Sequence, residues 1–257
     1  MPLINIPTIG CGYKEQYIKI AIFGIDTNVG KDNKEALSRF SRLKDDYDNN
    51  KNWEDIYDRL VKPFINMAFV EYANESIFYE FVLKFLAEFY KKELGFGWQG
   101  WEELKNNKEK YSGILQSFIL GNIHSFEIDK DICENGFKIK KSKSYNANEK
   151  DWAEVKKASK RFLDKKLKDI INICEPKLLL ILNWDSFNCK KWLDDNHYKR
   201  KDEICDFDNH FYYAHIETPN THIYKIVHPS SMVKKKIKFI EQISLIIEHF
   251  SNREDTD

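Results

Sequence analysis

The chain has 257 residues, of which 42% are apolar, and this length and composition suit one large domain. Its 41 basic and 41 acidic side chains cancel, and a net charge of zero argues against a protein that coats nucleic acid through bulk charge. No run of about 18 apolar residues could span a membrane, and residues 1–12 lack the pattern of a signal peptide, so we expect a cytoplasmic protein.

The first half of the chain predicts two buried strands separated by helices. The strands are the short apolar runs Ile18–Gly24 and Ser117–Ile123. Residues 76–94 carry apolar side chains at helical spacing and are followed by Gly95, which is typical of a helix end. Further helices are expected at 32–48 and 53–72, with a loop or short helix at 98–110.

The second half predicts a long helix, three strands and a final helix. A polar, lysine-rich excursion at about 127–150 precedes a helix at 152–174, which Glu175-Pro176 ends. Ser230 or Ser231 is expected to cap the final helix, which has an apolar stripe. The expected strands are Lys177–Trp184, Phe211–Ile216 and His222–Val227, with a loop through Asp206 and a turn at Thr218-Pro219-Asn220.

Helices between buried apolar strands imply a mainly parallel sheet that is covered on both faces. We therefore predict an α/β fold in a single domain: a three-layer α/β/α sandwich around a largely parallel sheet of four to five strands. In such sheets, ligands bind beyond the carboxyl ends of the strands. The residues expected there are Gly24–Asn28, Asn122–His124, Asn183–Asp185 and His228–Ser231.

Disulfide and metal chemistry are not expected. The five cysteines are scattered and form no CxxC pair, so buried free thiols are predicted rather than a disulfide framework or a zinc site. His210, His215 and His222 alternate along a hairpin region, but no carboxylate partner is evident, so we predict no metal site.

Two segments at the carboxyl edge of the predicted sheet carry the chemistry. Phe23-Gly24-Ile25-Asp26-Thr27-Asn28 ends the first strand, and Ile226-Val227-His228-Pro229-Ser230-Ser231-Met232 joins the last strand to the last helix. Each segment alone is a common turn or cap. Together they bring one carboxylate, Asp26, and one imidazole, His228, to a common cleft.

This pair of motifs resembles the signature of the uracil-DNA glycosylase superfamily. That superfamily carries a Gly-x-Asp or Gly-x-Asn segment after the first strand and a His-Pro-Ser segment after the last. The strands at 177–184 and 118–124 also match it, and the resemblance spans roughly residues 18–250. It implies an enzyme that flips a base out of DNA and hydrolyses its N-glycosidic bond, leaving an abasic site without strand cleavage. It implies neither a metal nor an organic cofactor.

The resemblance also implies roles for individual residues. Asp26 would position water and stabilise the cationic sugar, and His228 would donate a hydrogen bond to the departing base anion. Asn122 would read the edge of the flipped base. The other implied substrate contacts are Gly24, Ile25, Thr27, Asn28 and Ser230. The implied DNA contacts are Ser231, Met232 as a wedge in the duplex, Lys234, Lys235 and Lys236.

The first motif departs from that of the uracil-specific enzymes. Thr27 and Asn28 stand where those enzymes have Pro and an aromatic residue. In those enzymes the aromatic side chain excludes bases with a bulky ring substituent. A wider or more polar pocket is therefore expected, which does not restrict the substrate to uracil and has room for a modified base. The four-cysteine iron–sulfur pattern of some members is missing as well. Some related bacterial proteins excise modified bases from phage DNA, so the resemblance points to an uncharacterised or phage-defence-like branch.

Two other functions stay open on the same scaffold. Neutral net charge and the altered first motif favour a non-catalytic nucleic-acid-binding or inhibitory module. A nucleoside or nucleotide N-glycosidase that acts on free substrate is the other. Structural roles are also open, because Asp26 and Asn122 are common turn and strand-end residues and the three lysines suit a solvated helix start.

Overall fold

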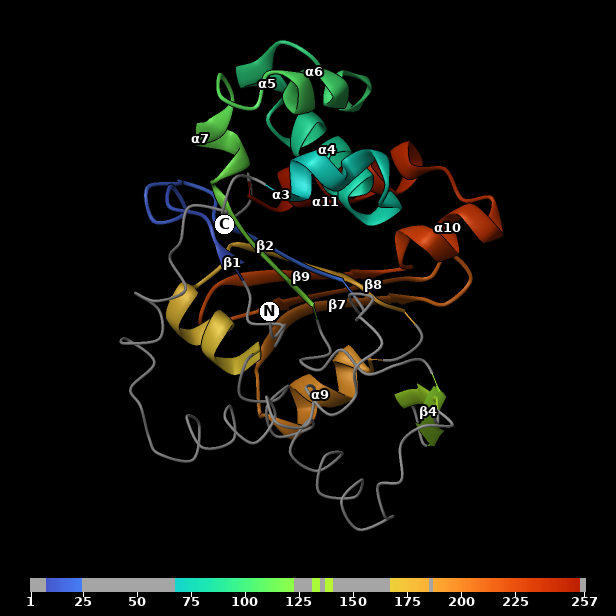
Figure 1. Cartoon of the computed structure of the whole chain (residues 1–257). Coiled ribbons are helices and arrows are strands. Elements are labelled where there is room, and N and C mark those ends of the chain that lie inside the picture. The colour runs from blue at the N-terminus through green and yellow to red at the C-terminus, as the bar shows by residue number, and fades with distance from the viewer. Residues whose placement is uncertain are drawn as a thin grey trace, which may run out of the picture.

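A computed structural model describes residues 8–24, 68–122, 131–134, 137–140, 167–184 and 187–254. These residues form a mixed α/β fold, in which helices pack against a central sheet (Figure 1). None of the helices in these ranges is long and apolar enough to cross a membrane.

The main sheet has seven strands in the order β1-β3-β2-β6-β9-β8-β7. The predicted number, four to five, is therefore wrong, although the five predicted strands are all present within a few residues of their expected bounds. The strands are β1 (Thr8–Ile9), β2 (Ile20–Gly24), β3 (Phe118–Asn122), β6 (Leu178–Leu182), β7 (Arg200–Asp206), β8 (Phe211–Ile216) and β9 (Thr221–Ile226).

The four central strands β3, β2, β6 and β9 run parallel, whereas β1, β8 and β7 add to the sheet in antiparallel fashion. The register pairs Gly24 with Asn122 and Leu182 with Ile226, so the carboxyl ends of all four central strands lie at one edge. The prediction of a largely parallel sheet therefore applies to the centre and not to the flanking strands.

Both faces of the central strands are buried. In β2, Ile20 and Ile22 belong to one hydrophobic cluster, and Ala21 and Phe23 belong to a second cluster on the opposite face. The helices α4, α10 and α11 cover the first face, and α9 lies on the other (Figure 1). Burial on both sides explains why β2 and β6 are continuous apolar runs in the sequence.

The helix predicted at 76–94 is present as α4 (Ile77–Phe89) followed by the short α5 (Lys91–Leu94). The Ser76 hydroxyl oxygen accepts a hydrogen bond from the Tyr79 backbone N–H, and Gly95 ends α5 with a left-handed φ of 73°. The other short helices of this region are α3 (Ala68–Glu71), η2 (Tyr72–Asn74), η3 (Trp98–Gly100), α6 (Trp101–Asn106) and α7 (Ser112–Leu115).

The single final helix that the sequence predicts is two helices, α10 (Pro229–Lys235) and α11 (Phe239–Glu254). Lys236 takes a left-handed conformation with a φ of 56°, and its N–H bonds to carbonyls of α10, which ends that helix. Met232 before the break and Ile243 after it are both fully buried, so the break lets both helices contribute to the core.

Helix α9 (Cys189–Asp195) and strand β7 occupy a region that the sequence predicts as a loop. Asn188 caps α9 by accepting a hydrogen bond from the Lys191 N–H at 3.0 Å. Strand β7 lies at the edge of the sheet and is rich in charged residues, so it lacks the apolar run that marks the central strands.

Several other predictions are only partly within the described residues. The helix expected at 152–174 ends as predicted, in a π-helical turn at Ile170–Cys174 (η4) followed by Glu175 with a φ of 46°. The lysine-rich excursion contains an antiparallel hairpin of β4 (Asp131–Glu134) and β5 (Phe137–Lys140). The helix expected at 32–48 and most of that at 53–72 lie outside the described residues.

The side chains of four cysteines are described, and all four are free thiols. Cys174 and Cys189 are buried as predicted, and burial raises the pKa of each thiol to about 12. Cys11 and Cys205 are exposed, so the prediction of buried thiols is wrong for these two.

Candidate active site at the carboxyl edge of the sheet

The chain adds strands to the sheet in opposite directions on the two sides of the β2–β6 pair. From β2 the chain continues to β3 on one side of the sheet, and from β6 it continues toward β9, β8 and β7 on the other. In open α/β sheets such a reversal leaves a crevice at the carboxyl ends, where ligands bind. Gly24 ends β2 at this point, and the fully buried Asn183 follows the end of β6. This edge is therefore the position in the fold that best suits a site.

Most of the first motif lies outside the described residues. Ile25, Asp26, Thr27 and Asn28 follow Gly24 directly in the sequence, and Asn122 is described only in its backbone. The described geometry at this edge therefore centres on His228 and on the elements that surround it.

His228 is the N-cap residue of α10, a role that the sequence analysis gives to Ser230 or Ser231. Its Nδ1 accepts a hydrogen bond from the Ser230 N–H at 3.3 Å, and Pro229 occupies the first turn of the helix. Because Nδ1 is the acceptor, the neutral ring carries its proton on Nε2. The helix cap thus determines which nitrogen of His228 can donate to a substrate.

The surroundings of His228 favour the uncharged ring. The imidazole is partly buried and stacks on Phe78 of α4, with centroids 5.8 Å apart and planes 1° from parallel. Desolvation lowers the pKa of His228 to about 4. At neutral pH the side chain is therefore a neutral hydrogen-bond donor and not an imidazolium.

The first N–H groups of α10 are occupied within the helix. The Ser230 N–H bonds to the His228 ring, and the N–H groups of Ser231 and Met232 bond to the His228 carbonyl at 2.8 and 3.0 Å. These backbone amides therefore serve the helix start rather than a ligand. Among the described residues nothing hydrogen-bonds to the hydroxyls of Ser230 and Ser231, which keep their capacity to contact a ligand.

The structure also corrects the role that the resemblance implies for Met232. Its side chain is 0% exposed and belongs to the hydrophobic cluster beneath α4 and α11, so it cannot enter a duplex without leaving the core. The next residue, Val233, is 54% exposed. Lys234, Lys235 and Lys236 are exposed, as the prediction of DNA contacts requires.

The tip of the β7–β8 hairpin brings aromatic side chains to this edge, and the sequence did not predict this hairpin. Pairing of Tyr212 with Lys225 aligns the hairpin tip with the end of β9. At the tip, Phe207 and His210 approach Trp184, which follows β6, with ring centroids 6.0 and 5.5 Å away. The turn residues Asp206 to Asn209, directly before the strand at 211–216, were the signal that could have revealed this hairpin.

Two lysines join this aromatic group. The Lys235 ammonium donates to Nε2 of His210 over 2.7 Å, which links α10 to the hairpin tip. The Lys225 Nζ lies 4.7 Å from the centroid of the Trp184 ring, in the geometry of a cation–π contact. The carboxyl edge therefore combines a neutral histidine with an aromatic and basic surface.

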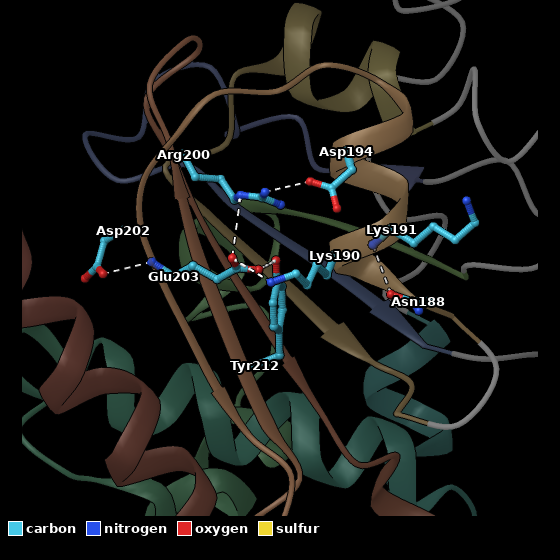
Figure 2. A network of polar contacts seen from close by, with 8 residues as sticks. All are labelled: Asn188, Lys190, Lys191, Asp194, Arg200, Asp202, Glu203 and Tyr212. Atoms are coloured by element: carbon cyan, nitrogen blue, oxygen red, sulfur yellow. Dashed lines mark hydrogen bonds and ion pairs between the residues drawn. The ribbon is translucent and has the colours of Figure 1, made fainter.

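Charged and polar groups anchor the hairpin to α9 (Figure 2). Glu203 accepts hydrogen bonds from the Tyr212 hydroxyl at 2.9 Å and from Lys190 at 3.1 Å, and Arg200 pairs with Asp194 at 2.6 Å. Desolvation is the largest cause that raises the pKa of Tyr212, with the Glu203 carboxylate adding to it. This network holds β7 and β8 in position, because each charge in it has an opposite partner.

The histidines of the hairpin region do not form a metal site in the described residues. The rings of His215 and His222 stack with centroids 4.0 Å apart. His215 hydrogen-bonds to Asn220, and Nδ1 of His222 lies 2.9 Å from the Tyr213 hydroxyl. Their ring nitrogens thus serve the packing of β8 against β9.

Comparison of the chain with known protein families, with curated proteins and with solved structures gave no match. Any assignment of function therefore depends on the motifs and on the geometry of the carboxyl edge.

Proposed function

We propose that the chain is a monofunctional DNA glycosylase on a three-layer α/β/α scaffold. The observation that carries the proposal is the state of His228: a neutral imidazole with its proton on Nε2, at the same edge where β2 ends two residues before Asp26. Cleavage of an N-glycosidic bond needs a carboxylate for the sugar and a neutral donor for the departing base, and Asp26 would supply the carboxylate.

The two groups would act on opposite charges of the same transition state. As the glycosidic bond breaks, its electron pair leaves with the base, and positive charge develops on the sugar. Asp26 would stabilise that cation and orient the water that adds to the anomeric carbon. The His228 Nε2–H would hydrogen-bond to the departing base anion, and the proton of the water ends on the released base. The target base must leave the duplex to reach these groups.

The substrate class follows from the first motif. Thr27 and Asn28 replace the Pro and the aromatic residue of the uracil-specific enzymes. Without that aromatic ring, the pocket would have room for a larger, modified base. Such a base occurs in DNA that carries bulky modifications, and removal of modified bases from phage DNA is the biological role that fits best. Gly24, Ile25, Asn122 and Ser230 would line this pocket.

A test is the formation of alkali-labile abasic sites by the purified protein on single and double strands. The substrates would contain uracil, hypoxanthine, 5-substituted cytosine or glucosylated cytosine, and phage genomic DNA would serve as a natural sample. The proposal expects abasic sites with the wild type and none with Asp26→Asn. An absence of base release from every substrate would contradict it and favour a non-catalytic binding module.

One observation favours a second candidate, an N-glycosidase for free nucleosides or nucleotides. Met232 is buried, so the wedge that the resemblance implies for DNA binding is missing. The salt dependence of the apparent KM separates the two functions. A DNA glycosylase should bind its substrate much more weakly as salt rises, whereas the KM for a nucleoside should change little.

A further inference from the structure

The tip of the β7–β8 hairpin presents an exposed aromatic ring. Phe207 is 72% exposed, and among the large apolar and aromatic side chains described only Tyr17, at 96%, is more exposed. The Phe207 and Trp184 rings meet edge to face with planes at 79°, and the exposed fraction of Phe207 leaves most of its side chain in solvent.

The ring is held in this position by its own turn. Asp206 accepts hydrogen bonds from the Asn209 backbone N–H at 3.0 Å and from the Asn209 side-chain amide at 2.7 Å. The His210 N–H bonds to the Phe207 carbonyl at 3.3 Å, and His210 adopts a left-handed φ of 52°. Phe207 therefore loses little freedom when a ligand contacts it, which favours binding.

Charges of both signs surround Phe207. Lys235 reaches the hairpin tip through His210, and its neighbours Lys234 and Lys236 are exposed, whereas Lys225, which lies over Trp184, is buried. The carboxylates of Asp206 and the exposed Asp208 flank the ring, with Asn209 bound to both oxygens of Asp206, so α10 provides the cationic side of this surface. A ligand that offers a flat π face next to a negative charge is complementary to this surface, and an unpaired nucleotide has both features.

The hairpin tip lies at the same edge as His228. Tyr212 at the start of β8 pairs with Lys225, three residues before His228 in the chain, and Lys235 links the tip to the helix that His228 caps. A strand of nucleic acid that delivers one base to His228 therefore approaches the same sheet edge that carries the hairpin tip.

We propose that Phe207 stacks on an unpaired base of DNA next to the nucleotide that enters the site, with Lys235 contacting the adjacent phosphate. This inference rests on DNA as the partner in the proposed function, and it gives the hairpin tip the contact that the buried Met232 cannot make. Stacking on an aromatic ring is tolerant of sequence, so the contact would secure the strand without selecting the neighbouring base.

The test measures the binding of a fluorescein-labelled single-stranded oligonucleotide by fluorescence anisotropy, in an Asp26→Asn background that prevents turnover. Phe207→Ala should raise the Kd roughly tenfold, and Phe207→Trp should restore binding to near the starting value. Tyr17→Ala is the matched control, because it removes an exposed aromatic ring at the amino end of β2, away from the site, and it should leave the Kd unchanged.

A second variant tests the phosphate contact. Lys235→Gln should weaken binding and make the slope of log affinity against log salt less steep by about one unit, whereas Phe207→Ala should leave that slope unchanged. Equal binding by Phe207→Ala and its parent, or no binding of the oligonucleotide by the parent, would overturn the inference.

The outcome separates this inference from the proposed function. Binding that depends on Phe207 without any base release supports the stacking surface and removes the glycosylase. Equal base release by the wild type and by a Phe207→Ala single variant, together with an unchanged Kd for the oligonucleotide, supports the glycosylase and rules out the stacking surface.

Discussion

His228 illustrates how a local contact determines chemistry at the scale of one residue. Capping α10 with Nδ1 assigns the proton to Nε2, and partial burial against Phe78 keeps the ring neutral. Neither effect follows from the His-Pro-Ser motif alone. The motif identified His228 as a candidate site residue, but a serine was expected to cap the helix. The same motif also contains Met232, whose burial depends on the packing of α10 and not on local sequence.

The lowered pKa of His228 predicts a dependence of stability on pH. His228 binds a proton near pH 6.5 in the unfolded chain and only near pH 4 in the folded protein. The free energy of unfolding is therefore undiminished by this residue above pH 6.5 and decreases as the pH falls from 6.5 toward 4. Between pH 7 and 5 this residue should reduce the free energy of unfolding by up to about 2 kcal/mol.

Urea unfolding at pH 7, 6 and 5 measures this effect. His228→Asn keeps an N-cap side chain but cannot titrate, so it should flatten the pH dependence. His197→Asn removes an exposed histidine at a left-handed position that Asn tolerates, and it should leave the pH dependence as it is. Equal slopes in the wild type and His228→Asn would argue against a buried neutral ring.

The neighbouring residues Met232 and Val233 provide a second test at this scale. Met232→Ala should reduce the free energy of unfolding by about 2–5 kcal/mol, because it opens a cavity in the core. Val233→Ala, one position further and half-exposed, should change it by less than about 0.5 kcal/mol. Thermal or urea unfolding measures both, and a small effect of Met232→Ala would return this residue to consideration as a wedge.

At the scale of elements, the break between α10 and α11 separates the site from the core helix. Apolar spacing continues through 233, 237 and 240, so periodicity alone predicts one helix. The structure ends α10 at Lys236 because its left-handed backbone turns the chain. A lysine in this conformation gives no sign in the sequence, since glycine is the residue that usually marks such a position.

Glycine substitutions on either side of this break should have opposite effects. Lys236→Gly should raise the free energy of unfolding by up to about 1 kcal/mol, because glycine adopts a positive φ without strain. Lys234→Gly, inside α10, should lower it by about 0.5–1 kcal/mol. Differential scanning calorimetry compares the two, and a loss of stability from Lys236→Gly would indicate that the break is not set by the backbone at this position.

At the scale of the whole molecule, the sequence predicted the centre of the sheet better than its periphery. The strands that end at Gly24 and Leu182 are apolar on both faces, so composition reveals them, and their common carboxyl edge follows from parallel pairing. Strand β7 is charged and lies at the sheet edge, where Glu203 and Arg200 take the place of an apolar pattern, and the short helix α9 is charged along its exposed side. The hairpin tip and Phe207 were therefore missed, although they border the predicted site.

We propose that Asp26 and His228 together cleave an N-glycosidic bond in DNA. Single-turnover release of free base from modified or phage DNA tests it most directly, with Asp26→Asn and His228→Asn as the variants, the second of which retains the helix cap. We expect base release by the wild type and a loss of at least about 100-fold in rate for each variant, with unfolding temperatures close to that of the wild type. Equal rates in all three proteins, or no release by the wild type from any DNA in the panel, would contradict this account.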